Sequence, residues 1–420
     1  MRIAFIHPRF PSAEGTGATH SATQIVTGLS DAGHDVCVYC TRSPEENSKM
    51  GGMELRHLTG NSEHPHTDTR LNKEVTARLD ELREFEIVHS YLTPLIPSLA
   101  RVGKDSDVGT VVTLNSYRGT CAKNDLLYRG REKCQSKSTL KCLNCITHAG
   151  FRHSDKGYFY QTGSRFLALR LVNAGERRLK YIDRFQALSP HVKETYSNFG
   201  YEANKIEVIP NILDRRFEIE HASEFEDSLR LLYVGSLKEQ KGADKLIDIL
   251  TRVRSKVDRE IQLTIVGDGE LRATLEKQTS ELGVSDVVEF RGRVPNSELP
   301  SVYASHDIFV YPGRWDEPFG RIFLEAMAAG TPIVATDVGS VSDIIGKAGV
   351  VTDQSVLSIV SGIQSLLDRE TLLQHSKAGR NEIQRFYSSE VLPQFEQLYQ
   401  SVLKVSTNKG FTANRSVDST

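Results

Sequence analysis

The sequence predicts an α/β protein made of two doubly wound domains, each a parallel sheet with helices on both faces. Short apolar runs rich in β-branched residues alternate with longer amphipathic segments through most of the chain, which is the pattern of parallel strands joined by crossover helices. The alternation breaks in a polar segment after Pro210 and then restarts. The 420 residues are enough for two or three domains of about 150 residues each.

The first domain is predicted at residues 1–210. Its strands are expected where runs are short, apolar and bounded by turn residues, and its helices where apolar residues recur every three or four positions. The expected strands are 2–7, 35–41, 86–89, 110–114, 184–188 and 205–209, and the expected helices are 20–32, 71–84 and 163–180.

The segment 211–227 is polar and charge-rich, which predicts a connection between domains. The second domain is predicted at residues 228–388. Its expected strands are 231–234, 262–266, 287–290, 308–311 and 333–335. A last amphipathic helix, 389–405, is expected to pack back on the first domain. The polar tail 406–420 is expected to be disordered.

Composition excludes several classes of protein. Hydrophobic residues make up 39% and charged residues 25% of the chain, values typical of a soluble globular protein rather than a disordered one. No stretch reaches the ~18 uninterrupted apolar residues of a membrane span. The apolar run at the amino terminus ends at His7-Pro8-Arg9, which is too early for a signal peptide. We therefore expect a cytoplasmic protein.

Charge is unevenly distributed, although the formal net charge is only −2. Residues 115–184 contain 15 Lys and Arg against 5 Asp and Glu, and this segment includes a predicted insertion at about 116–160. Such a segment is either an ordinary solvated surface or a face for an anionic acceptor or for membrane headgroups. The balanced total gives no indication of a nucleic-acid partner.

Glycine-rich loops follow three of the predicted strands. In open α/β sheets ligands bind beyond the carboxyl ends of the strands, and glycine lets a backbone approach an anion at the start of a helix. Each loop is by itself also compatible with a simple tight turn. The loops are 14–19 with Gly15 and Gly17, 235–242 with Lys238 and Lys241, and 267–269 with Gly269.

The most specific stretch is 311–330, YPGRWDEPFGRIFLEAMAAG. A loop ending in Pro318-Phe319-Gly320 leads into a helix whose unpaired N–H groups can bind a phosphate. Glu317 lies in the loop and Glu325 eight positions later on the helix. Carboxylates accept hydrogen bonds from hydroxyls, so the ligand should combine a diphosphate with polyols. A nucleotide-sugar has that composition.

These residues resemble those of glycosyltransferase family 4, which comprises retaining enzymes of the GT-B fold. Glu317 and Glu325 match the E-x7-E motif of the family, and Lys241-Gly242 matches its phosphate loop. Residues 15–18 match its glycine-rich first loop, and 326–332 match the segment after the second glutamate. The resemblance covers nearly the whole chain and implies two Rossmann-like domains that face a central cleft.

The resemblance also implies a role for each matching position. Glu317 would bind donor-sugar hydroxyls, Glu325 the ribose hydroxyls and Lys241 the diphosphate, with Glu317, Lys241 and Asn115 as the catalytic set. No divalent metal would be needed, because cations and helix amino ends stabilise the leaving diphosphate. The remaining expected donor-binding residues are Gly17, Ser236, Lys238, Gly269, Val294, Phe319, Gly320, Arg321 and Ile322.

Three positions depart from the family pattern. Ser236 stands where the family often has an arginine, so Lys238, Arg321 or another cation would have to compensate. Asn115 stands where the family usually has a histidine near the donor sugar. Asn211-Ile212 replaces an asparagine-glycine pair at the crossing between domains. The first two departures bear on reaction rate and donor, and the third only on turn geometry.

Six cysteines divide into two sets. Cys37 and Cys40 lie in a predicted strand, where small buried thiols are expected. The other four lie in the basic insertion, where a C-x2-C pair behind two spaced cysteines predicts either a structural zinc site or four free thiols. This predicted metal set is Cys121, Cys134, Cys142 and Cys145.

The sequence therefore predicts a hexosyltransferase that uses a nucleotide-diphosphate-sugar and needs no catalytic cofactor. The expected acceptor is a hydroxyl of a glycan or lipid-linked glycan in surface polysaccharide or glycoconjugate assembly. Two alternatives remain: a nucleotide-sugar epimerase on the same fold, and a non-catalytic donor-binding partner subunit. The basic helix 165–184 predicts either a peripheral contact with an anionic membrane or a core helix with ordinary surface charge.

Overall fold

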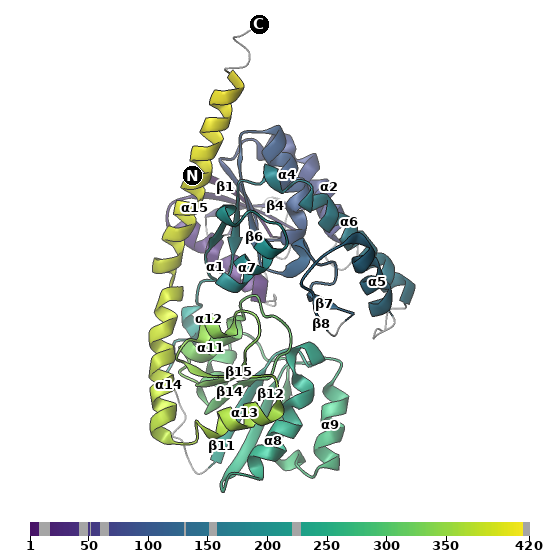
Figure 1. Cartoon of the computed structure of the whole chain (residues 1–420). Helices are drawn as coiled ribbons and strands as arrows, with labels where there is room; N and C mark the ends of the chain where they lie inside the picture. Colours follow the sequence, from purple (N-terminus) through teal and green to yellow (C-terminus); the bar gives the residue numbers. More distant parts are fainter. Residues whose placement is uncertain are drawn as a thin grey trace. The chain divides into compact units, whose positions relative to one another are not determined.

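The computed structural model describes residues 1–7, 17–41, 49–50, 52–58, 67–129, 132–150, 158–220 and 228–414. The chain divides into two compact units, each with its own parallel sheet and covering helices (Figure 1). The first unit is formed by Met1–Ile212 together with Ser388–Thr420, and the second by Leu213–Tyr387. The second unit is thus continuous in sequence, whereas the first is assembled from both ends of the chain.

The first unit contains an eight-stranded sheet in the order β10-β9-β6-β5-β1-β2-β4-β3. The described strand pairs are parallel except for β3 with β4. The strands are β1 (Arg2–Ile6), β2 (Asp35–Cys40), β3 (Lys49–Met50), β4 (Met53–His57), β5 (Ile87–Ser90), β6 (Gly109–Leu114), β9 (Arg184–Ala187) and β10 (Ile206–Val208). The short strands β7 (Leu127–Tyr128) and β8 (Glu132–Lys133) pair separately.

The helices of this unit cover its sheet and include the last helix of the chain. Among them, α2, α4 and α6 pack against one another (Figure 1). The helices are α1 (Gly17–Asp31), α2 (Thr67–Ala77), α3 (Leu79–Leu82), α4 (Ile96–Asp105), α5 (Thr139–Gly150), α6 (Tyr158–Glu176), α7 (Pro190–Asn198) and α15 (Ser388–Asn414).

Helix α15 completes the core of the first unit. Its side chains Phe395 and Tyr399 are fully buried in the same apolar cluster as Phe5 of β1. The Tyr399 hydroxyl lies 2.7 Å from Nδ1 of the buried His89, whose Nε2 lies 2.8 Å from the Thr113 hydroxyl. Burial lowers the pKa of His89 to about 3, so this imidazole is neutral and serves as an internal hydrogen-bonding link.

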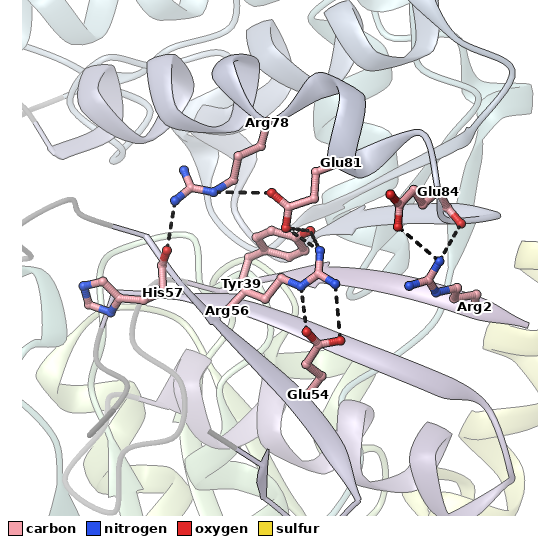
Figure 2. Close-up of polar contacts among 8 residues, drawn as sticks. All are labelled: Arg2, Tyr39, Glu54, Arg56, His57, Arg78, Glu81 and Glu84. Atoms are coloured by element: carbon pink, nitrogen blue, oxygen red, sulfur yellow. Dashed lines mark hydrogen bonds and ion pairs between the residues drawn. The ribbon is translucent and has the colours of Figure 1, made fainter. Parts of the chain in front are cut away.

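A charged network braces the edge of the first sheet (Figure 2). Arg56 on β4 donates to Glu54 at 2.9 Å and to the Tyr39 hydroxyl at 3.1 Å, and it pairs with Glu81 of α3. Tyr39 donates to Glu81 at 2.8 Å. Burial, together with Glu81, raises the pKa of Tyr39 well above its usual range, so the hydroxyl keeps the proton it donates.

Removing the central cation of this network is expected to destabilise the first unit. Arg56→Met leaves Glu81 and Tyr39 without their shared partner, at a cost of about 1–3 kcal/mol in free energy of unfolding. The control is Arg83→Met, whose partner Asp80 is 94% exposed and should contribute less than about 1 kcal/mol. Urea unfolding followed by circular dichroism measures both values, and equal losses would show that the network contributes nothing beyond an exposed pair.

The second unit contains a six-stranded sheet in the order β13-β12-β11-β14-β15-β16, and its strand pairs are parallel. The strands are β11 (Ser228–Val234), β12 (Glu260–Val266), β13 (Val288–Gly292), β14 (Ile308–Tyr311), β15 (Ile333–Thr336) and β16 (Gly349–Thr352). The helices are α8 (Leu246–Arg254), α9 (Arg272–Glu281), α10 (Leu299–Ala304), α11 (Arg321–Ala328), α12 (Val341–Ile345), α13 (Val356–Gln364) and α14 (Arg369–Glu382).

Several elements differ from the sequence-based expectation. Strands β4 and β16 and helix α4 were not expected. The predicted connection 211–227 contributes core residues, because Ile212, Leu213 and Phe217 are buried. Helix α15 continues to Asn414, beyond its predicted end at 405 and into the tail expected to be disordered. An existing helix extends at little cost, since each added residue gains a hydrogen bond without a new nucleation step.

Within the described residues, none of the helices combines the length and the apolar character that crossing a bilayer requires.

Candidate active site

The sheet of the second unit reverses its direction of growth between β11 and β14. From β11 the chain adds β12 and β13 on one side, and β14, β15 and β16 then extend the other side. In open α/β sheets ligands bind at the carboxyl edge of the sheet, next to such a reversal. The Lys241 loop follows β11 and the Glu317 loop follows β14, so both predicted catalytic positions of this unit lie there.

Lys241 and Glu317 meet at this edge. The Lys241 ammonium forms an ion pair with one carboxylate oxygen of Glu317. The Tyr311 hydroxyl, from the last residue of β14, donates to the same oxygen at 3.0 Å and lies 3.4 Å from the Lys241 Nζ. Glu317 is 8% exposed. A cation, a carboxylate and a phenol are thus held together by two loops that are far apart in sequence.

Trp315 forms one wall of this cluster. The Lys241 Nζ lies 4.7 Å from the centroid of the Trp315 ring, within the range of a cation–π contact. The backbone N–H of Trp315 donates to the Gln240 carbonyl at 3.1 Å, which joins the two loops directly. Trp315 is the only tryptophan in the chain, so its fluorescence reports on this place alone.

Two further side chains brace the loops. Arg314 binds both carboxylate oxygens of Asp244 at 2.6 Å, a bidentate geometry that fixes orientation as well as distance. The buried Lys245 donates to the Gln354 carbonyl at 2.8 Å and to the Pro312 carbonyl at 3.3 Å. Burial, followed by the charge of Arg314, lowers the pKa of Lys245 to about 8. Lys245 is thus occupied by backbone carbonyls, and Lys241 is the lysine beside Glu317.

Glycine is required at two points of these loops. Gly242 has φ +72°, and a Cβ there would lie 1.9 Å from the Pro312 carbonyl oxygen, so a side chain would force the two loops apart. Gly320 has φ +73° and directly precedes α11. Among the described residues, no side chain caps the amino end of α11, so the helix dipole and its first N–H groups favour an anion at this point.

The second glutamate of the motif has its own partners. Glu325, 7% exposed on α11, accepts from the Tyr303 hydroxyl at 3.2 Å and lies 3.7 Å from the Arg321 guanidinium. Burial raises the pKa of Glu325, although Arg321 and Tyr303 act in the opposite direction. Arg321 is thus close to Glu325, in the first turn of the helix whose amino end would receive a phosphate.

The other predicted donor-binding residues of this unit follow neighbouring strands. Ser236 accepts at its carbonyl from the Tyr233 hydroxyl at 2.9 Å, and Lys238 is exposed. A Cβ on Gly269 would lie 2.5 Å from the Leu237 carbonyl oxygen, so the loops after β11 and β12 are in close contact. Val294 follows β13, and Phe319 and Ile322 flank the start of α11. The structure therefore brings this set to one edge of one sheet.

Two predicted residues belong to the first unit. Asn115 follows β6; its amide donates to the Tyr91 carbonyl at 2.7 Å and accepts from the Thr93 hydroxyl at 3.2 Å. Both ends of the amide are thus hydrogen-bonded within this unit, and a catalytic role for Asn115 stays a prediction. Gly17 is exposed at the start of α1, while Gly15 lies outside the described residues.

The four cysteines of the insertion line one small cavity of about 30 Å³, but the zinc alternative finds no support in the structure. In the parts of the chain that the structure describes, no three His, Cys, Asp or Glu side chains are arranged to hold a metal ion. The Cys145 sulfur accepts from the Arg129 N–H at 3.1 Å, and the Cys134 thiol lies 3.3 Å from the Ser136 carbonyl. Burial raises the pKa of Cys121 and of Cys142.

Sequence reasoning missed the aromatic members of the cluster. Tyr311, Trp315 and Tyr303 contact Glu317, Lys241 and Glu325, but none was among the predicted site residues. The signal was available for two of them, because Tyr311 ends a predicted strand and the only tryptophan of the chain lies in the motif loop. Tyr303 lies on α10, in a different segment of the chain, and only the folded structure shows its contact with Glu325.

Two family models match the chain. The model described as Glycosyltransferase Family 4 matches residues 15–217, and the model described as Glycosyl transferases group 1 matches residues 214–384. Together they span both units.

Curated relatives match mainly over part of the chain. An uncharacterized glycosyltransferase of Methanocaldococcus jannaschii is 40% identical over 120 residues, which are 29% of this chain and 30% of that protein. A GDP-mannose-dependent alpha-(1-6)-phosphatidylinositol monomannoside mannosyltransferase of Mycobacterium tuberculosis is 33% identical over 202 residues, 44% of this chain and 52% of that protein. The chain thus spans about a third to a half of the length of these relatives.

Solved structures resemble the whole chain. Sucrose-phosphate synthase from Thermosynechococcus elongatus has a TM-score of 0.72 at 18% identity, with 96% of this chain and 99% of that chain covered. The Anabaena protein HepE, solved in complex with UDP, has a TM-score of 0.68 at 18% identity, with 96% and 100% covered. At this identity the likeness concerns the fold, and it confirms the predicted class of two Rossmann-like α/β domains.

Proposed function

Because the chain belongs to glycosyltransferase family 4 and has the GT-B fold, we propose that it is a retaining glycosyltransferase. It moves a hexose from a nucleotide-diphosphate-sugar to a hydroxyl of a glycan or lipid-linked glycan. The observation that carries this proposal is the meeting of Lys241 and Glu317 next to the uncapped amino end of α11. A cation and a helix amino end suit a diphosphate, and a carboxylate suits sugar hydroxyls.

In this proposal the diphosphate takes the place of Glu317 as the partner of Lys241. The lysine and the amino end of α11 then stabilise the negative charge that develops as the glycosidic bond breaks, and stabilisation of developing charge commonly contributes more to catalysis than any other single effect. Glu317, released from Lys241 but still bound to Tyr311, accepts from hydroxyls of the donor sugar. Arg321 adds a cation near the same helix end, which offsets the missing arginine at Ser236. No step is assigned to a divalent metal.

The relatives support a nucleotide-sugar donor without identifying it. One relative is named as GDP-mannose-dependent and HepE was solved with UDP, so guanine and uracil nucleotides are the first to test. The acceptor in this proposal is glycan or lipid-linked, in surface polysaccharide or glycoconjugate assembly. A screen of glycan and lipid-linked acceptors tests this part of the proposal.

Trp315 provides a direct binding test. Titration of the purified protein with UDP, GDP and ADP, each followed by the matching nucleotide-sugars, is expected to change tryptophan fluorescence for one base only. The ring lies against Lys241, so a diphosphate that takes Lys241 as its partner alters the surroundings of the indole. Fluorescence that does not respond to any of these ligands would contradict the assignment of this edge as the donor site.

Product analysis separates the alternatives. A transferase releases nucleotide diphosphate when an acceptor is present, whereas an epimerase converts the nucleotide-sugar and leaves it intact. A donor-binding subunit without activity would change Trp315 fluorescence and release nothing. Chromatography of the nucleotide products, with and without glycan and lipid-linked acceptors, distinguishes the three outcomes.

Glu325→Gln is expected to raise the donor KM about tenfold while changing kcat little, because contacts with ribose are nearly equal in the ground and transition states. The carboxylate is held by Tyr303 and Arg321, and the neutral amide would weaken a charge-assisted hydrogen bond to the ribose. Steady-state kinetics in donor concentration measures the effect. A loss confined to kcat would place Glu325 at the reacting bond instead of at the ribose.

A further inference from the structure

A groove of about 670 Å³ lies on the surface of the first unit, within the range of ~300–1,000 Å³ that is common for small-molecule sites. It is formed by α2 and α4 with the segment around η3 (Leu179–Tyr181). None of the residues proposed for donor binding lines it. Its polar and charged lining includes Lys73, Arg101, Lys104, Asp105, Arg178 and Tyr181.

The groove is strongly basic. Four basic side chains face a single carboxylate, Asp105, and that carboxylate is already bound by Arg101 at 2.9 Å. Within the described residues, Lys73, Lys104 and Arg178 have no carboxylate at ion-pair distance. Three positive charges from three separate segments of the chain therefore line one groove without compensation, an arrangement that attracts an anion of more than one charge or a densely charged surface.

The floor of the groove is fixed by buried hydrogen bonds. The Asn72 amide donates to the Pro94 carbonyl at 2.9 Å and accepts from the Ser98 N–H at 3.0 Å. Asn72 and Ser98 are 8% and 2% exposed. On the rim, the Lys104 ammonium lies 5.8 Å from the centroid of the Tyr181 ring. The cations thus project from a rigid base that joins α2 to α4.

Exposed apolar side chains lie on the adjoining helices. Among the described residues of the first unit, the large hydrophobic side chains that are exposed are Leu140 of α5, at 81%, and Tyr160 and Phe166 of α6, at 44% and 46%. Gly163, Phe166 and Arg170 are exposed at helical spacing along α6, so an apolar and a basic side chain share one face. Helix α6 packs against both α2 and α4.

We propose that the groove binds the phosphate headgroup of an acidic phospholipid. Lysine offers a point charge and arginine a planar pair of donors to phosphate oxygens, and the uncompensated cations here are of both kinds. Free phosphate would use the cations alone. A lipid surface also accounts for the exposed apolar residues on α5 and α6, because such residues enter the headgroup region while basic residues hold the acidic lipids.

The binding step itself does not depend on transferase activity, but the purpose we assign to it, bringing the enzyme to a lipid-linked acceptor, rests on the proposed function. The two are separable. The groove is lined by the first unit alone, whereas the proposed donor residues Lys241, Glu317 and Glu325 belong to the second.

The test is flotation of the full-length protein with two kinds of vesicle, phosphatidylcholine alone and phosphatidylcholine mixed with phosphatidylglycerol. The protein is expected to float with the acidic vesicles at low salt and to be released as salt rises. The triple variant Lys73→Gln, Lys104→Gln, Arg178→Gln is expected to lose on the order of a hundredfold in partition, since each basic residue near an acidic surface contributes several-fold.

A matched control removes the same charge elsewhere. The variant Arg254→Gln, Lys256→Gln, Lys347→Gln changes three exposed basic residues of the second unit and is expected to partition like the parent protein. Equal partition of the groove variant and this control would overturn the proposal. So would tight binding of inorganic phosphate or glycerol phosphate in the groove without flotation, because the ligand would then be a free phosphate.

Further controls separate loss of binding from loss of folding. Circular dichroism unfolding of the groove variant checks that the first unit is folded. Lys104→Glu alone, at an exposed position, is a second variant that should also reduce flotation. Release of nucleotide diphosphate measured without vesicles checks the second unit. Lost flotation with intact release supports the groove assignment, whereas intact flotation without release of nucleotide contradicts only the proposed function.

Discussion

Replacing Lys241 with alanine is expected to lower kcat by roughly a hundredfold to a thousandfold, about 3–4 kcal/mol of transition-state stabilisation, as when a donor to a developing oxyanion is lost. The side chain is 21% exposed and contacts Glu317, Tyr311 and Trp315, so a water molecule in its place would stabilise the diphosphate charge less than the ammonium does. Initial rates at saturating donor measure the loss.

Lys238→Ala is the control for this substitution. Lys238 lies in the same loop and is exposed, and its replacement removes the same charge, so the loss should be less than about tenfold. A greater loss at Lys238 than at Lys241 would show that the loop presents the other lysine to the diphosphate. Unfolding curves of both variants establish that the second unit is intact.

Glu317→Gln is expected to lower kcat by roughly tenfold to somewhat over a hundredfold, with a smaller change in donor KM. The substitution keeps the shape of the side chain and removes the charge that strengthens hydrogen bonds to the donor sugar, a difference of about 1.5–3 kcal/mol per charged hydrogen bond. The control Glu239→Gln changes an exposed acid of the facing loop and should be neutral.

The contact between Lys241 and Glu317 can be tested separately, by combining the two substitutions in one variant. Effects of substitutions at side chains in contact are not additive, so the double variant Lys241→Ala, Glu317→Gln should lose less activity than the two single losses combined. Tyr311→Phe, which removes the hydroxyl 3.0 Å from Glu317, should produce a smaller loss of the same kind. Full activity in Glu317→Gln would remove this residue from the donor site, and strict additivity would show that the pair acts as two separate groups.

Much of the fold follows from local sequence. The runs predicted at 2–7, 110–114 and 308–311 became β1, β6 and β14 with small changes at their ends, because fully buried parallel strands are continuous apolar runs. Strand β4 was missed because Met53, Leu55 and the polar residues between them alternate near the sheet edge, over a length too short to stand out. Helix α4 was missed because Pro97 obscures its start, although proline is well tolerated in a first helical turn.

The candidate site was predictable in its loops but not in its contacts. Glycines and a glutamate pair in sequence order indicate which loops carry a ligand, and the strand order then decides which of those loops meet. Only the structure shows that Tyr311 and Trp315 flank Lys241, or that Asp244 and Arg314 brace the loops. The spacing of the insertion cysteines left zinc and free thiols as alternatives, and among the described residues no group of side chains arranged to hold a metal ion supports the zinc alternative.

The return of the last helix to the first unit has a consequence for how the protein is made. A domain that is continuous in sequence can fold as soon as it leaves the ribosome, and the second unit, Leu213–Tyr387, meets that condition. The first unit, although its strands are synthesised earlier, lacks Phe395, Tyr399 and Val402 of its core until α15 has been synthesised. The sheet of the first unit therefore stays incompletely packed, with His89 lacking its Tyr399 partner and apolar surface exposed, while the second unit folds first. Chaperone dependence and sensitivity to deletion of α15 should both concentrate in the first unit.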